Sequence, residues 1–111
     1  MVSITKEQKR ITLINVFTVS PERQAELIAL LTRATESAVE HIAGFISSSL
    51  HRGLDGTKVA MYAQWRSVED YESMRRDAGA SPFLQEALTF ASFASGMYEV
   101  VDIFTAAEKT A

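Results

Sequence analysis

The stretch ITLINVFTVSPERQAELIALL, residues 11–31, decides the fold because its hydrophobic pattern changes period partway along. Its first part is rich in β-branched and aromatic side chains, which favour a strand. Ser20 and Pro21 then supply a helix cap and a first-turn proline. Apolar residues recur at helical spacing from there to Ile42, and Gly44 ends the pattern. We therefore predict a strand over 11–19 and a helix of about 22 residues after it.

Two further strands follow this helix and are joined by a tight turn. Residues 45–52 and 57–65 have strand character, and Gly-Leu-Asp-Gly at 53–56 has the composition of a hairpin turn. Strict alternation in the first of these two strands predicts one face made of Phe45, Ser47, Ser49 and His51.

The last third of the chain predicts helical segments and a final strand. Ser67 and Asp70 have the spacing of a capping box, so a helix begins there and carries Tyr71 and Met74. Ser81 and Pro82 begin another helical stretch, which extends to Gly96. The segment MYEVVDIF, residues 97–104, is then predicted as the last strand.

The resulting order, βαββαβ, is typical of an α+β ferredoxin-like fold, with a four-stranded antiparallel sheet and its helices on one face. A chain of 111 residues fits one such domain. We expect the domain over residues 10–105, with an N-terminal tail at 1–9 and a C-terminal tail at 106–111.

Composition narrows the classes of function. The formal net charge is −3. Neutralising the phosphates of a nucleic acid requires a surface rich in Lys and Arg, so no nucleic-acid partner is expected. The chain has no cysteine, which excludes disulfides and thiolate chemistry. No apolar run approaches the ~20 residues that span a bilayer, and the first ten residues do not resemble a signal peptide. We expect a soluble cytoplasmic protein without a membrane partner.

The predicted strands are apolar on both faces. The first strand places Leu13 and Phe17 on one side and Ile14 and Val16 on the other. Helices can cover only one face of the sheet, and a solvated second face should alternate into polar residues. We predict a homodimer through the sheet face, and the alternative is scattered surface apolar residues, which are common in proteins.

Three residues are candidates for a site, each with a structural alternative. Asn15 interrupts an otherwise apolar strand face. It is either a hydrogen-bond donor in a pocket or an amide whose hydrogen bonds are satisfied by the backbone or by an ordered water. Trp65 lies at the end of a strand, where it is either a flat wall for an aromatic ligand or a residue of the hydrophobic core. Tyr71 lies in the first turn of the next helix, near that region or simply on the surface. The two histidines form no metal-binding spacing.

No glycine-rich phosphate loop and no nucleophile elbow occurs in the sequence. A nicotinamide or flavin cofactor would require a phosphate-binding device of this kind. We therefore expect no cofactor and no metal.

Three segments together carry a resemblance to a known family. They are INVFTVSPERQAEL (14–27), HRGLDGTKVAMYAQWRSVEDYESM (51–74) and MYEVVDIF (97–104), and they resemble the antibiotic biosynthesis monooxygenase domain. The resemblance implies a dimeric α+β barrel that often works without metal or cofactor. Its best-known members oxidise polyketide anthrones to quinones with O₂, so the substrate itself is the reductant.

The resemblance also implies roles for individual residues. Trp65 matches a pocket tryptophan and Tyr71 a helix tyrosine near the substrate. Quinone-forming members carry an asparagine where this chain has Met61, which cannot donate to an oxyanion. Asn15 and Trp65 also match haem-degrading members, but no histidine follows His51 to ligate iron, so haem degradation is not expected.

We therefore predict a cofactor-independent monooxygenase or quinol oxidase that acts on a small aromatic, polyketide-like or quinol-like molecule with O₂. The alternative is a non-catalytic dimeric ligand-binding or accessory module on the same scaffold. The predicted catalytic residues are Asn15, Trp65 and Tyr71, and the predicted substrate contacts are Phe17, His51, Met61 and Phe83.

Overall fold

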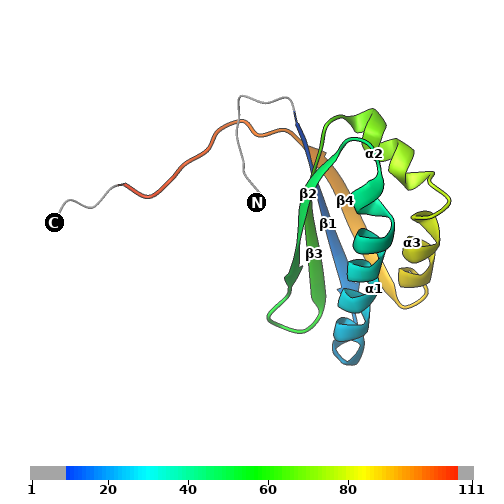
Figure 1. Ribbon diagram of the computed structural model, residues 1–111. Helices are drawn as coiled ribbons and strands as arrows, with labels where there is room; N and C mark the ends of the chain where they lie inside the picture. Colours follow the sequence, from blue (N-terminus) through cyan, green and yellow to red (C-terminus); the bar gives the residue numbers. More distant parts are fainter. Residues whose placement is uncertain (1–9, 108–111) are drawn as a thin grey trace.

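The computed structural model describes residues 10–107 of the chain. Its four strands form one antiparallel sheet in the order β2-β3-β1-β4, and its helices cover one face of that sheet (Figure 1). This confirms the predicted α+β ferredoxin-like fold. The elements are β1 Ile11–Val19, α1 Gln24–Ser37, β2 Phe45–Arg52, β3 Lys58–Trp65, α2 Val68–Arg75, α3 Ser81–Ala87 and β4 Ala91–Tyr98, with short 3₁₀ helices at Pro21–Arg23 and Val39–His41.

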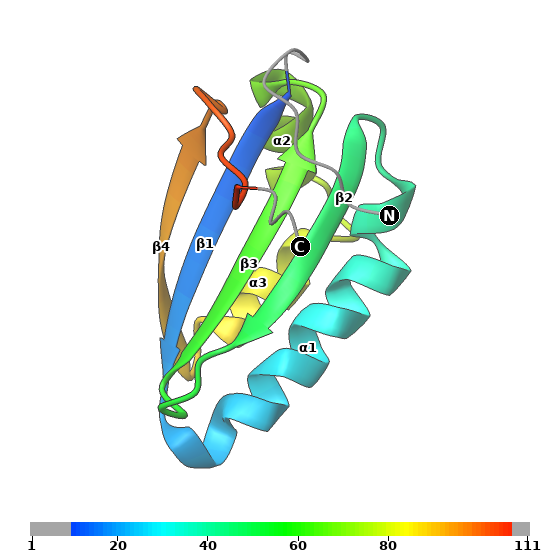
Figure 2. The same cartoon turned by 90° about the vertical axis from the view of Figure 1, so that its left-hand side faces the viewer.

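Strand β1 lies in the centre of the sheet, paired with β3 on one side and with β4 on the other. Its alternation separates the two faces as predicted. Leu13 and Phe17 point to the helices and are each 2% exposed, whereas Val16 on the opposite face is 37% exposed. Among the described residues no helix lies over that opposite face, which Figure 2 shows from the front. We call it the outer face, and the face under the helices the inner face.

The predicted face of β2 is wrong because the strand carries a β-bulge. Phe45 pairs with Trp65, but the register then shifts so that Ser47 pairs with Gln64 and Ser48 with Ala63. One extra residue in a strand moves every later side chain to the other face. Phe45 therefore shares the inner face with Ser48, and His51 points to the outer face instead.

Helix α1 is shorter than predicted, because the chain leaves α-helical geometry after Ser37. The hydroxyls of Thr32, Thr35 and Ser37 donate to carbonyls four residues earlier, a pattern that competes with regular helix geometry. The 3₁₀ turn at Val39–His41 continues the chain to Gly44, which has a positive φ of 91°. The helical spacing of apolar residues therefore extends beyond the α-helix itself, because the residues after it form a 3₁₀ turn.

Helix α2 begins at the predicted cap. The Ser67 hydroxyl accepts a hydrogen bond from the Asp70 backbone N–H at 3.1 Å and donates to the Asp70 carboxylate at 2.9 Å. The Arg66 guanidinium also donates to this carboxylate, at 2.8 Å. Arg66 first and Ser67 second hold the pKa of Asp70 below its usual range. The capping prediction is confirmed, although Asp70 bonds the Ser67 side chain and not its backbone.

The predicted last strand, 97–104, and the long helix before it are wrong. Helix α3 ends at Ala87, and β4 runs from Ala91 to Tyr98 along the whole of β1. The residues ASFASGMY have weak β-propensity, which pairing with a central strand overrides. Tyr98 already pairs with Thr12 near the beginning of β1, so β1 offers almost no partner to the apolar residues that follow.

Residues 99–107 leave the sheet without regular secondary structure and extend from the body on its outer-face side (Figure 1). The expected tail at 1–9 and residues 108–111 of the expected C-terminal tail lie outside the described residues. In the described part of the chain, no helix is long and apolar enough to cross a membrane.

Candidate active site

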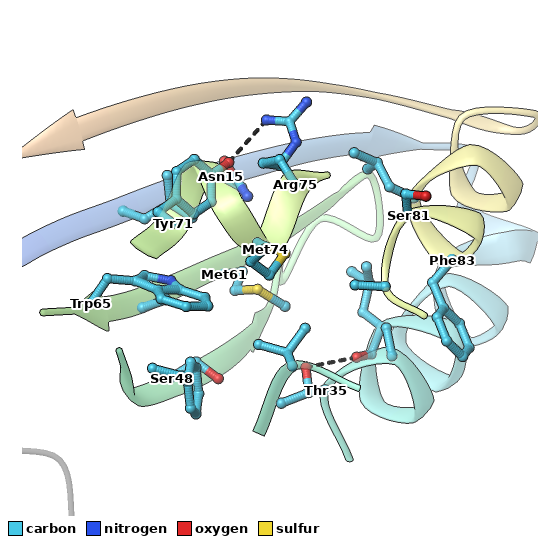
Figure 3. A pocket seen from close by; sticks show the side chains of 18 of the residues that line it. Asn15, Thr35, Ser48, Met61, Trp65, Tyr71, Met74, Arg75, Ser81 and Phe83 are labelled. Carbon is cyan, nitrogen blue, oxygen red and sulfur yellow. Dashed lines mark hydrogen bonds between the residues drawn. The ribbon is translucent and has the colours of Figure 1, made fainter. Parts of the chain in front are cut away.

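A cavity lies between the inner face of the sheet and the three helices (Figure 3). Its volume is about 90 Å³, several times the roughly 10–15 Å³ that one water molecule requires. Most of its lining is apolar, which suits a flat hydrophobic ligand. The side chains that bear polar atoms are those of Asn15, Thr35, Ser48, Trp65, Tyr71, Arg75 and Ser81.

Asn15 lies on β1 at the cavity wall and is only 9% exposed. Its Oδ1 atom is buried and has no hydrogen-bond partner. An unpaired buried polar atom costs about 1–3 kcal/mol, so structures rarely keep one without a reason. No backbone group of the described residues donates to this oxygen, so the backbone does not satisfy it. The oxygen is therefore available to a ligand.

Trp65 forms a wall of the cavity at the end of β3 and is 1% exposed. Its ring makes edge-on contacts with Phe45 at 5.3 Å and with Tyr71 at 5.9 Å between centroids. Such contacts fix the indole plane. Trp65 is therefore both a core residue and a pocket wall, so the two interpretations from sequence do not exclude each other.

Tyr71 is buried at 3% exposure in α2, which excludes the surface alternative. Its hydroxyl accepts a hydrogen bond from Nη1 of Arg75, one helical turn later, at 3.0 Å (dashed in Figure 3). The Arg75 guanidinium also lies 5.9 Å from the ring centroids of Tyr71 and Phe93. Helix α2 thus brings a phenol and a cation to the same wall of the cavity.

Three further predicted contacts reach the cavity. Met61 on β3 is the direct cross-strand partner of Asn15. Phe17 on β1 stacks on Phe93 of β4 with ring centroids 5.2 Å apart. Phe83 enters from α3. The structure therefore brings together six of the seven predicted site residues: Asn15, Phe17, Met61, Trp65, Tyr71 and Phe83.

His51 does not join them. It pairs with Ala60, which in turn pairs with Val16, so its side chain lies on the outer face. There it is exposed, and its Nε2 lies 2.9 Å from the Ser49 hydroxyl. The bulge in β2 is the physical reason, because it exchanges the faces of all residues after Phe45.

Sequence reasoning missed Ser48, Met74 and Arg75. Ser48 reaches the cavity only because of the bulge, which no local pattern reveals. Arg75 follows Tyr71 at the i, i+4 spacing that places two side chains on one helix face, so its position was available from the sequence. Among the described residues no group of three or more His, Cys, Asp or Glu side chains could hold a metal ion.

The fold and this cavity define a class of protein: a small ferredoxin-like α+β domain with a largely apolar, aromatic-walled pocket between its sheet and its helices. The family model described as antibiotic biosynthesis monooxygenase matches residues 10–81. The chain is also 42% identical over 82 residues to tetracenomycin-F1 monooxygenase of Streptomyces glaucescens, a match that covers 74% of this chain and 73% of that protein. The chain belongs to the antibiotic biosynthesis monooxygenase family.

Solved structures support the fold at lower identity. SnoaB of Streptomyces nogalater, a cofactor-independent oxygenase, superposes with a TM-score of 0.75 at 20% identity, covering 85% of this chain and 95% of that one. Rv0793 of Mycobacterium tuberculosis gives a TM-score of 0.75 at 17% identity, covering 87% and 100%.

Proposed function

We propose that this chain is a monooxygenase that uses O₂, without a bound cofactor, to oxidise a flat aromatic polyketide-like molecule held in the cavity. The observation that carries the proposal is the unpaired Oδ1 of Asn15, buried in an otherwise largely apolar pocket. A relative that shares 42% identity over most of its length is a monooxygenase, which supports the same reaction type.

The proposed reaction converts a ring CH₂ flanked by aromatic rings into a carbonyl. The substrate loses a benzylic proton to water, and the resulting carbanion gives one electron to O₂. The two radicals combine into a peroxide, which takes up a proton and loses water. The balance is one CH₂ group and one O₂ giving one C=O and one H₂O, so the substrate supplies every electron.

Residues of the chain act by placement and charge stabilisation. Trp65 and Phe17 hold the plane of the substrate rings. A fixed orientation of the reactants accounts for much of the rate enhancement in such reactions. The Asn15 Nδ2 group and the Tyr71 hydroxyl can donate to the substrate oxygens on which the negative charge of the carbanion is delocalised, and the unpaired Asn15 Oδ1 can accept from a substrate hydroxyl. Preorganised donors at a developing oxyanion are worth about 2.7–4 kcal/mol each.

The direct test is O₂ uptake by the purified, metal-free protein with a hydroxyanthrone and no added cofactor. We expect uptake well above autoxidation, together with the absorption of the quinone product. The matched control is the Asn15→Leu variant, which keeps the size of the side chain without its amide. Uptake no faster than in protein-free buffer would contradict the proposal.

A second candidate function rests on Met61. Its thioether stands opposite Asn15 and supplies no hydrogen-bond donor to a developing oxyanion. A non-catalytic module that binds the same class of aromatic molecule would need only the pocket. Tight binding of an anthraquinone without O₂ uptake from the corresponding anthrone would favour this function.

We also propose a homodimer that closes the two sheets into an α+β barrel through their outer faces. Ile14, Val16 and Tyr62 lie on this face, which no described helix covers. The segment 99–107 extends on the same side and carries Val101 and Phe104, which are 83% and 87% exposed. Apolar side chains on an extended segment without a strand partner suit contact with a second copy.

A further inference from the structure

Arg75 is the only charged side chain among the described residues that line the cavity. It occupies the last position of α2 and is exposed, so it stands at the opening of the cavity. Behind it the lining is uncharged and mostly apolar. A charge beside a region of low dielectric attracts an opposite charge more strongly than a fully solvated charge does.

No carboxylate of the described residues forms an ion pair with Arg75; the described ion pairs are Arg23–Glu26 and Arg66–Asp70. The guanidinium donates one hydrogen bond, to the Tyr71 hydroxyl. A guanidinium carries five N–H donors, so most of its donors remain available to a ligand.

The hydrogen bond to Tyr71 has a consequence for the phenol. Because the Tyr71 oxygen accepts from Arg75, its own proton is free to donate elsewhere, and no described residue accepts it. The phenol and the guanidinium are 3.0 Å apart, so one anionic oxygen group at the opening of the cavity can accept from both.

We propose that Arg75, together with the Tyr71 hydroxyl, is a specificity-determining site that selects aromatic ligands bearing a carboxylate. The aromatic rings of the ligand lie between Trp65 and the phenylalanines that line the cavity. The carboxylate of the ligand lies at the opening, against the Arg75 guanidinium. A guanidinium matches the planar geometry of a carboxylate with two parallel N–H donors. This inference deepens the proposed function by naming the substrate class, and it rests on ligand binding in that cavity, not on turnover.

The test measures binding of anthraquinone carboxylate and of its neutral isostere, anthraquinone carboxamide, through quenching of tryptophan fluorescence. Trp65 is the only tryptophan of the chain and lines the cavity, so its emission reports occupancy. We expect the carboxylate to bind about tenfold more tightly than the carboxamide, a difference of ~1.4 kcal/mol. We expect Arg75→Gln to remove this preference and Arg75→Lys to keep part of it.

Arg76→Gln is the matched control, because Arg76 is the next residue, is exposed and does not line the cavity. It should leave the preference unchanged. The proposal is overturned by equal affinity of the wild type for both ligands, by absence of quenching with either, or by a preference that survives Arg75→Gln. Equal weakening of both ligands in Arg75→Gln also overturns it, since that pattern indicates a structural role. A carboxylate preference without O₂ uptake would keep this proposal and refute the monooxygenase.

Discussion

Asn15 and Met61 are directly opposed across the β1–β3 ladder, and both side chains line the cavity. The family resemblance implies an asparagine at the position of Met61 in members that form quinones. In this chain the amide stands instead on the neighbouring strand, one cross-strand pair away. Asn15 is the only carboxamide among the described cavity-lining residues, so any role for an amide in this pocket falls to Asn15.

Replacement of Asn15 by leucine should separate stability from activity. The variant removes a buried oxygen without a partner, so we expect its free energy of unfolding to rise by about 1 kcal/mol, or at least not to fall. Oxidation of a hydroxyanthrone should slow by about 10²-fold or more, the usual cost of losing one oxyanion donor. Urea denaturation and O₂ uptake measure the two effects. A marked loss of stability would instead indicate a structural amide.

The size of Trp65 should matter for both packing and turnover. The Trp65 side chain is almost completely buried, so Trp65→Ala should lower the free energy of unfolding by about 3–5 kcal/mol. A loss of activity in that variant could not be separated from unfolding. Trp65→Phe keeps an aromatic wall and should stay folded while the catalytic rate falls. Circular dichroism and O₂ uptake on the same preparation test this. A phenylalanine variant with the full rate would make Trp65 a core residue only.

Local chemistry made most of the fold predictable. Ser20-Pro21, the 53–56 turn and the Ser67 cap each act within a few residues, so their sequences indicate where elements begin and end. The site followed from the same pattern, since alternation along β1 puts Asn15 and Phe17 on one face.

What could not be predicted depended on pairing between distant segments. The bulge that turns His51 outward exists only relative to β3. The segment 91–98 becomes a strand because β1 has a free edge there, and residues 99–104 lose that role because almost all of β1 is already paired. Arg75 is a different case: its i, i+4 spacing from Tyr71 was visible in the sequence and places both side chains on one face of α2. Only the docking of α2 on the sheet shows that this face meets the cavity.

Substitution of Val16 by aspartate should prevent dimer formation without unfolding the protomer. Val16 is already 37% exposed on the outer face, so the charge costs little in a single chain but would be buried in the proposed interface. Light scattering should then give half the wild-type mass, with an unchanged circular dichroism spectrum. Leu54→Asp is the matched control, because Leu54 lies fully exposed in the hairpin turn. The outer-face dimer would be refuted by a wild-type mass for Val16→Asp.

Acid should weaken the fold partly through Asp70. The Arg66 guanidinium and the Ser67 hydroxyl keep the pKa of Asp70 lower in the folded chain than in the unfolded chain. The unfolded chain therefore binds the proton more readily, and the stabilisation, present above about pH 3.9, is lost as the pH falls through the folded pKa. In urea denaturation, the loss of stability between neutral pH and about pH 3 should be smaller in Asp70→Asn than in the wild type. Glu69→Gln removes an exposed charge from the same helical turn without breaking a described ion pair, so it should keep the wild-type pH dependence. An Asp70→Asn variant with the full acid sensitivity would mean that the ion pair with Arg66 contributes nothing to stability.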